Sequence, residues 1–233
     1  MIDFNDKRQV AKAIQYTNVN PNLTRDGMLK HLETCMKYDF QAAMVAPCYI
    51  EQAKDVLKGT GIQVASTLNF PIANDTLPMK IAALKEMIKT GVDQFDFPPN
   101  PGLLLGGEEK AYFEEMRQIV EVAHASGVIV KAMLEFGYIT TPELKKKAAQ
   151  LACEAGIDWV KQSSGWGVGG CPATAEDVKI LKENITLPCR VKVSGKVNTL
   201  EKMKTMFEAG AELVGTSSGP AIVDGLVGDI NAY

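Results

Sequence analysis

Segments with strand character alternate with amphipathic, helix-like segments along nearly the whole chain. Such alternation is typical of parallel α/β folds, in which a crossover helix follows each strand. Eight strands close a (β/α)8 TIM barrel, and 233 residues with 46% hydrophobic content suit one such domain, spanning 1–233. The expected strands are 13–17, 42–46, 63–68, 94–97, 128–134, 158–161, 190–193 and 213–215, and the expected helices are 24–38, 77–89, 109–125, 142–154, 174–182 and 200–208.

An open, doubly wound sheet is the alternative architecture. Sheets of that kind commonly carry a G-x-G-x-x-G loop after the first strand, where a dinucleotide binds. Residues 16–21 read YTNVNP and contain no glycine. We therefore expect the closed barrel.

An internal repeat supports the barrel. Residues 154–165 (EAGIDWVKQSSG) align without a gap to residues 208–219 (EAGAELVGTSSG). In both copies a glycine suited to end a helix precedes the strand, and weaker copies of this joint occur at 90–93 and 126–128. One helix–glycine–strand unit therefore recurs, and Lys161 stands where the other copy has Gly215.

Two lysines stand at the ends of expected strands. Lys161 closes the run 157–160, and Lys192 lies within RVKVSG at 190–195. Barrel active sites lie at the carboxyl ends of the strands, so the two ammonium groups should be neighbours. Mutual repulsion and burial would lower their pKa values, and a neutral amine can attack a carbonyl to form a Schiff base. The alternative is that each lysine simply extends from its strand end into solvent.

Glycine- and serine-rich loops follow two of these strands. They read SSGWGVGG at 163–170 and GTSSGP at 215–220. Exposed backbone N–H groups and serine hydroxyls can surround a phosphate, and barrels often bind phosphate with loops near the end of the chain. Ordinary tight turns have the same composition, so this reading stays one of two.

Two carboxylates complete the candidate site. Asp96 lies near the end of the fourth expected strand, and Glu135 follows the fifth. Either could relay a proton to or from a Schiff-base intermediate. The alternative for both is an ion pair that holds a lysine in place.

Composition narrows the class of protein. The formal charge of −3 comes from interspersed residues with no basic block, which argues against nucleic-acid binding. Apolar runs fall short of the roughly 20 residues of a membrane helix, and the first residues lack the order of a signal peptide, so we expect a cytoplasmic protein. The five cysteines are odd in number and widely spaced, and we expect reduced thiols, with no disulfide, metal or other cofactor.

With these residues assembled, the chain resembles the deoxyribose-phosphate aldolase family, class I aldolases that join acetaldehyde to glyceraldehyde 3-phosphate. VKQSSG at 160–165 is similar to the family's V-K-T-S-T-G, VKVSG at 191–195 to V-K-A-S-G-G, and VDQFD at 92–96 to A-D-E-I-D. The resemblance implies that Lys161 forms the Schiff base, that Lys192 is its second lysine and that Asp96 moves the proton through water.

Further similarities extend the match from about residue 14 to 226. VAPC at 45–48 is similar to A-V-C-V, LEFG at 134–137 to L-E-T-G, and GTSS at 215–218 to the phosphate-binding G-x-S-S. We therefore expect sugar-phosphate and aldehyde substrates. The residues expected to bind them are Cys48, Glu135, Ser164, Gly165, Gly195, Lys196, Gly215, Ser217 and Ser218.

Several positions depart from the family pattern. Gln15 stands where the family usually has an aspartate, and Trp166 and Asn198 stand where basic residues occur. Lys196 replaces the second glycine of S-G-G and could restore a cation. These changes leave two alternatives open: an imine-forming aldolase with a different or non-phosphorylated acceptor, and a non-catalytic barrel that binds a sugar phosphate. Barrels of this size often associate, and a homodimer is the assembly we consider, although no expected helix has a conspicuously apolar outer face.

Overall fold

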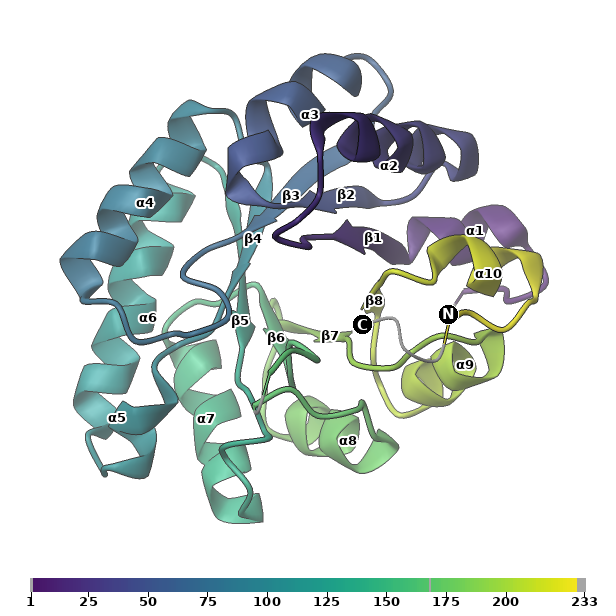
Figure 1. Cartoon of the computed structure of the whole chain (residues 1–233). Coiled ribbons are helices and arrows are strands. Elements are labelled where there is room, and N and C mark those ends of the chain that lie inside the picture. The colour runs from purple at the N-terminus through teal and green to yellow at the C-terminus, as the bar shows by residue number, and fades with distance from the viewer. Residues whose placement is uncertain (1, 168, 230–233) are drawn as a thin grey trace.

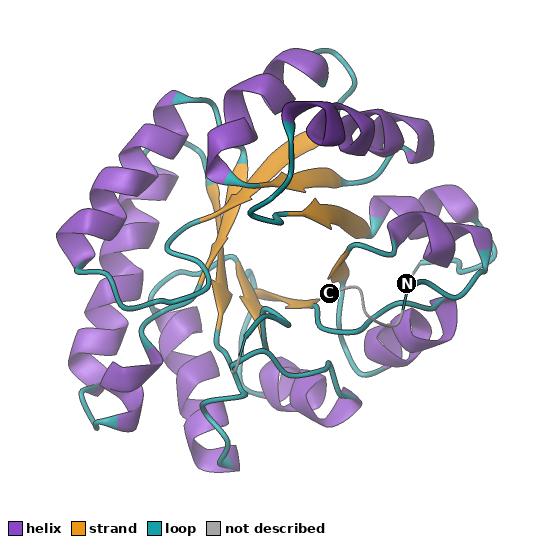
Figure 2. Cartoon of the chain, in the orientation of Figure 1, coloured by secondary structure: helices purple, strands orange, loops and turns teal. Residues whose placement is uncertain are grey.

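Eight parallel strands form a closed barrel in which each strand pairs with its neighbours in sequence and β1 pairs with β8. The computed structural model describes residues 2–167 and 169–229. Figures 1 and 2 show the strands as an inner ring with helices around them, which confirms the predicted TIM barrel. The strands are β1 (Ile14–Asn18), β2 (Ala42–Val45), β3 (Gln63–Thr67), β4 (Gln94–Phe97), β5 (Ile129–Met133), β6 (Trp159–Lys161), β7 (Arg190–Val193) and β8 (Leu213–Thr216).

The six predicted helices are present, with ends that differ by at most one residue. They are α2 (Arg25–Tyr38), α4 (Leu77–Lys89), α6 (Glu109–His124), α7 (Pro142–Glu154), α8 (Ala175–Glu183) and α9 (Leu200–Glu208). The structure adds elements too short to show an amphipathic period: α1 (Lys7–Lys12), the 3-10 turn η1 (Pro47–Tyr49), α3 (Ile50–Val56), α5 (Pro101–Leu105) and α10 (Gly219–Asp224). In the described part of the chain, none of the helices is long and apolar enough to cross a lipid bilayer.

The predicted helix–glycine–strand joints have the expected backbone. Gly156 and Gly210 have φ of +88° and +118°, the left-handed region that favours glycine. At the other ends, Thr24, Thr141 and Thr199 cap α2, α7 and α9 by accepting hydrogen bonds from backbone N–H groups. The glycine that ends the helix in each copy of the repeat therefore fixes where the following strand, β6 or β8, begins.

The two faces of the barrel wall differ in chemistry. On β4, Phe95 and Phe97 belong to the large apolar core shared with the helices, whereas Asp96 between them does not. Successive residues of a strand point to opposite faces, so Asp96 points into the barrel. Inside, Ala42, Met44 and Ala65 form a small separate apolar cluster on β2 and β3. The polar interior is therefore built mainly by the other strands.

Candidate active site

Three lysines and one aspartate meet inside the barrel: Lys131 of β5, Lys161 of β6, Lys192 of β7 and Asp96 of β4. Strand register brings them together, because Lys161 is paired with Lys192 and Asp96 is paired with Lys131 on the adjoining strand. All four side chains are at most 2% exposed. The structure thus unites the three residues predicted to be catalytic and adds a third lysine.

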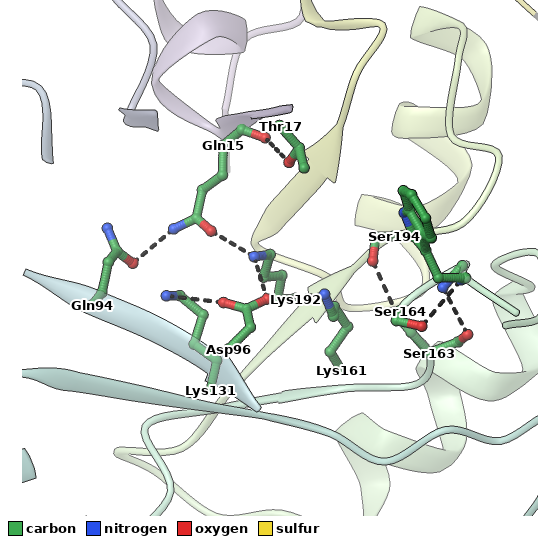
Figure 3. Close-up of polar contacts among 12 residues, drawn as sticks. Gln15, Thr17, Gln94, Asp96, Lys131, Lys161, Ser163, Ser164, Lys192 and Ser194 are labelled. Carbon is green, nitrogen blue, oxygen red and sulfur yellow. Dashed lines mark hydrogen bonds and ion pairs between the residues drawn. The ribbon is translucent and has the colours of Figure 1, made fainter. Parts of the chain in front are cut away.

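Asp96 is the centre of this group (Figure 3). Its Oδ2 accepts hydrogen bonds from Lys192 Nζ at 2.7 Å and Lys161 Nζ at 2.9 Å. Its Oδ1 lies 3.3 Å from Lys131 Nζ. One carboxylate is therefore shared by the three lysines.

The charges in this cluster shift one another's titration. Burial alone would raise the pKa of Asp96, but the ammonium groups of Lys161, Lys192 and Lys131 outweigh it and hold that pKa well below its usual range. Burial lowers the pKa of Lys192 well below its usual value, and repulsion from Lys161 adds to the effect while Asp96 opposes it. Burial likewise lowers the pKa of Lys131. Asp96 is thus anionic, and Lys192 and Lys131 give up their protons more readily than an ordinary lysine does.

Sequence reasoning missed Lys131. Lys131 lies in the middle of an expected apolar strand. It was therefore not grouped with Lys161 and Lys192, which lie near strand ends and are followed by serine and glycine. A charged residue flanked by Val130 and Ala132 was a usable signal, since a lysine within a buried strand needs an anionic partner.

Glu135 binds the loop that follows Lys161. Its carboxylate accepts a hydrogen bond from Ser164 N at 3.1 Å and from Ser163 Oγ at 3.3 Å. Burial raises its pKa, although these hydrogen bonds oppose the shift. Ser163 Oγ in turn accepts from Cys171 N at 2.9 Å, so the carboxylate and the hydroxyl together fold the loop back over the strand end. The sequence did not suggest this contact with the loop, and the parts of Glu135 in proton relay and in substrate binding stay predictions.

A depression of about 600 Å³ opens beside the carboxyl ends of β1 and β8. Gly165, Lys196 and Ser217 line it, as the phosphate prediction requires. Trp166 and Asp229 also line it, so the depression is lined by the carboxylate of Asp229 as well as by the ammonium of Lys196. Lys202 was missed from the sequence: its Nζ donates to Asn198 Oδ1 at 2.8 Å and to Lys196 O at 3.1 Å, and it therefore braces this loop.

The other predicted phosphate-site residues lie deeper. Ser164 and Ser218 are 1% and 5% exposed. Gly195 has φ of +97°, and a Cβ there would lie 2.4 Å from Cys171 O. A Cβ at Gly215 would lie 3.0 Å from Lys192 Cε, so Gly215 leaves the space that Lys192 occupies. Close packing therefore explains why both positions are glycine, whether or not a phosphate binds there.

Cys48 is the predicted residue that the structure places elsewhere. It is exposed in η1 and lines a separate depression with Arg25 and Glu51. The turn after β2 directs it away from the lysines, because η1 leads outward into α3. The five cysteines are free thiols, as predicted.

Two aromatic residues connect loops across the barrel mouth. Phe70 follows β3 and Trp166 follows β6, and their rings meet edge to face with centroids 5.8 Å apart. Strands β4 and β5 stand between β3 and β6 in the barrel. The contact therefore spans the ends of the strands that carry Asp96 and Lys131.

Metal binding has no visible basis in residues 2–167 and 169–229. In that part of the chain no group of three or more His, Cys, Asp or Glu side chains could hold a metal ion.

Comparison with known proteins agrees with this geometry. Residues 29–225 match the model of the DeoC/LacD family of aldolases. A deoxyribose-phosphate aldolase from Thermococcus kodakarensis is 37% identical over 222 residues, which cover 94% of this chain and 98% of the relative. The structure of "QR15, an Aldolase" has a TM-score of 0.86 at 26% identity, covering 92% of this chain and 94% of that chain. The structure of a deoxyribose phosphate aldolase from Aeropyrum pernix, described as tetrameric, has a TM-score of 0.86 at 23% identity, covers 94% of this chain and 92% of its own, and shows likeness of fold.

Proposed function

Because this chain belongs to the DeoC/LacD family of aldolases, we propose that it reversibly cleaves 2-deoxy-D-ribose 5-phosphate into acetaldehyde and D-glyceraldehyde 3-phosphate through a Schiff base on Lys161. The observation that carries the proposal is the placement of Lys161 and Lys192 on one oxygen of Asp96, at 2.9 and 2.7 Å. A nucleophilic amine, a second amine with a lowered pKa and an ionised carboxylate are the groups that imine chemistry needs.

The synthetic direction shows each role. Lys161, as a neutral amine, attacks the acetaldehyde carbonyl, and loss of water from the adduct gives the imine. Lys192, whose lowered pKa makes its unprotonated form more abundant than that of an ordinary lysine, takes the proton that Lys161 gives up and returns it to the hydroxyl that leaves as water. Asp96, through a water molecule, removes a proton from the carbon next to the imine to give the enamine. The enamine carbon attacks the second aldehyde, the aldehyde oxygen takes up the proton that Asp96 and the water removed, and hydrolysis of the new imine releases the product and Lys161.

Trapping with borohydride tests the imine. Reduction in the presence of acetaldehyde should leave an ethyl group on Lys161, read by peptide mass spectrometry. Lys161→Ala should abolish both trapping and turnover, whereas Lys179→Ala, an exposed lysine on α8, should change neither. Activity of Lys161→Ala within about tenfold of the unaltered protein would refute the assignment, because loss of a covalent nucleophile should cost several times the 1.36 kcal/mol that equals a factor of ten.

The acceptor is proposed to bind by its phosphate in the depression lined by Gly165, Lys196 and Ser217. Lys196→Ala should then raise KM for glyceraldehyde 3-phosphate and leave KM for glyceraldehyde nearly unchanged, since it removes binding at a distance from the reacting carbon. Lys179→Ala is the control. Equal loss for both acceptors would make Lys196 a structural residue.

A different or non-phosphorylated acceptor is the second candidate. Trp166 favours it, because this indole lines the depression at a position that is basic in some members of the family the chain resembles. A panel of acceptors with and without phosphate separates the two candidates. Absence of borohydride trapping would instead favour a barrel that binds sugar phosphate without catalysis.

The remaining features of the proposal concern the whole protein. We propose one domain over 1–233, a cytoplasmic location and a homodimer. The tetramer described for the Aeropyrum pernix aldolase is a property of that protein. Sedimentation velocity at several concentrations would measure the assembly of this one.

A further inference from the structure

A cluster of buried and half-buried glutamines lies beneath the lysines. Gln15 of β1 and Gln94 of β4 are fully buried, and Gln41 and Gln63 are half-buried nearer the amino-terminal end of the barrel. Gln15 Nε2 donates to Gln94 Oε1 at 2.7 Å and to Gln41 Oε1 at 2.9 Å. Gln94 and Gln41 each donate in turn to Gln63 Oε1, at 2.9 and 2.8 Å. The four amides therefore form one connected network.

This network ends on the active-site cluster. Gln15 Oε1 accepts a hydrogen bond of 2.5 Å from Lys192 Nζ, and Figure 3 shows Gln15 lying between Gln94 and Lys192. An ammonium group only donates hydrogen bonds, so the Gln15 oxygen must face it. Both N–H groups of the Gln15 amide are used by Gln94 and Gln41. Turning the amide over would place N–H against ammonium and oxygen against two oxygens, which makes the observed orientation the satisfied one.

We propose that Gln15 is a positioning residue for Lys192: the glutamine network fixes its amide oxygen on the Lys192 amine, which anchors that amine without adding a second negative charge to the barrel. The inference rests on the proposed function for its catalytic meaning, because Lys192 is the proton acceptor for Lys161 in that scheme.

The absence of charge on Gln15 matters because the lysines already outnumber their anion. Asp96 forms ion pairs with Lys131, Lys161 and Lys192, so full protonation would leave two unbalanced positive charges around it. A carboxylate at position 15 would offset one of them and favour the protonated form of Lys192. An amide gives the same directional contact and leaves the imbalance, which keeps Lys192 able to exchange a proton.

Two further residues border the contact between Gln15 and Lys192. Thr17 Oγ1 donates to Gln15 O, and Gly215 of β8 leaves space for the Lys192 chain. Below the network, Gln41 and Gln94 reach a depression at the amino-terminal end of the barrel. The charged residues lining that depression are Lys12, Asp158, Arg190 and Glu212, with both signs represented.

The test compares two Gln-to-Glu changes. Gln15→Glu places the new carboxylate on Lys192. Gln41→Glu is the matched control, because its oxygen already accepts from Gln15 and the charge enters farther from the lysine. The readout is the ε-carbon resonance of Lys192 in ¹³C-lysine-labelled protein, assigned by its loss in Lys192→Met, followed from pH 5 to 11.

We expect Gln15→Glu to raise the titration midpoint of Lys192 by about 1 pH unit or more, as an adjacent opposite charge does, and Gln41→Glu to raise it by less than half as much. The pH dependence of borohydride trapping on Lys161 should change only for Gln15→Glu. An unchanged Lys192 midpoint in Gln15→Glu, or an equal rise in both variants, overturns the proposal.

A neutral variant guards against misfolding of Gln15→Glu. Gln15→Met keeps the side-chain length and removes the acceptor, and it should lower kcat without raising KM for acetaldehyde. An unaltered kcat would count against a positioning role. The resonance titration reads Lys192 without turnover, so failure of trapping in the unaltered protein would refute the Schiff-base function while leaving the Gln15 contact independently tested.

Discussion

Asp96 decides the chemistry available at the scale of single residues. Its carboxylate stays ionised because three ammonium groups outweigh the cost of burying it. The same carboxylate orients Lys161 and Lys192 side by side on its Oδ2. Asp96 is thus the counter-ion of both amines, and in the proposed mechanism it also carries the proton.

Lys192→Met tests the electrostatic role of the second lysine. Lys161 and Lys192 repel each other, and the repulsion acts on both. The two amines share one carboxylate oxygen, so a proton on either one disfavours a proton on the other. Without Lys192, Lys161 should therefore keep its proton to higher pH, and the rise of imine formation with pH should move upward by about 1 unit. Stopped-flow measurement of imine formation with acetaldehyde across pH 6–10 gives the profile.

Lys196→Met is the matched control for this change, since it removes a lysine at the mouth of the barrel. A slower rate with an unmoved profile in Lys192→Met would mean that Lys192 orients the substrate and that its charge is incidental.

Residues at strand ends could be found from the sequence, and those within the strands could not. Lys161 is the last residue of its strand, and Lys192 and Asp96 lie one residue before the ends of theirs, close to where a barrel places its chemistry. Lys131 and Gln15 lie deeper along their strands, and what they touch depends on the register between strands. That register pairs Asp96 with Lys131 and is set by packing of the whole barrel.

At the scale of elements, the loops after β3 and β6 meet over the barrel mouth. Phe70 and Trp166 reach each other across the ends of β4 and β5, and Lys161 below is 2% exposed. The sequence analysis identified the loop after β6 and made no prediction about the one after β3. The aromatic contact joins segments almost a hundred residues apart and could not be read from local sequence. Contacts of this kind depend on loop conformations that a strand pattern does not specify.

Trp166→Ala should widen the barrel mouth and relax selection among acceptors. With the edge-to-face contact to Phe70 gone, kcat/KM for a bulky aromatic acceptor aldehyde relative to glyceraldehyde should rise roughly tenfold, as expected when a pocket wall is removed. Steady-state kinetics with the two acceptors measures the ratio.

Trp159→Ala is the control for this prediction. Trp159 is the first residue of β6, at the end of that strand opposite to Trp166. Its ring centroid lies 5.4 Å from the guanidinium carbon of Arg190. It should alter stability without altering the ratio. If Trp166→Ala leaves the acceptor ratio unchanged, the aromatic contact does not govern access.

The molecule as a whole carries a cost for its charged interior. The outer face of the barrel packs on an extensive apolar core, while the inner face buries three lysines with one carboxylate. Isolated buried charges destabilise a fold unless they are paired, and active sites commonly retain such groups at the expense of stability. The sequence predicted the barrel because the apolar pattern that stabilises it is repeated in every unit. The buried charges are not part of that repeated pattern. They meet only because the strands that carry them close into a barrel.

Removing the buried carboxylate and removing one buried lysine should therefore change the stability of the barrel in opposite directions. Asp96→Asn leaves the lysines without their anion and should lower the free energy of unfolding by about 3–5 kcal/mol. Lys131→Met removes the ammonium with the longest contact to Asp96, 3.3 Å, keeps an apolar chain of similar length, and should raise the free energy of unfolding by about 1 kcal/mol. Urea unfolding followed by far-UV circular dichroism gives both values.

The pH dependence checks the cause of that difference. Burial lowers the pKa of Lys131 in the folded protein, so between this lowered value and the ordinary lysine value near 10.4 the unfolded chain binds more protons. Stability from this residue must then rise as pH rises through that window. Lys131→Met should remove part of the rise, and its stabilising effect should be larger at pH 7 than at pH 10. A Lys131→Met protein that is less stable than the unaltered one at pH 7 would show instead that Lys131 is held in the barrel by interactions that outweigh the cost of burying it.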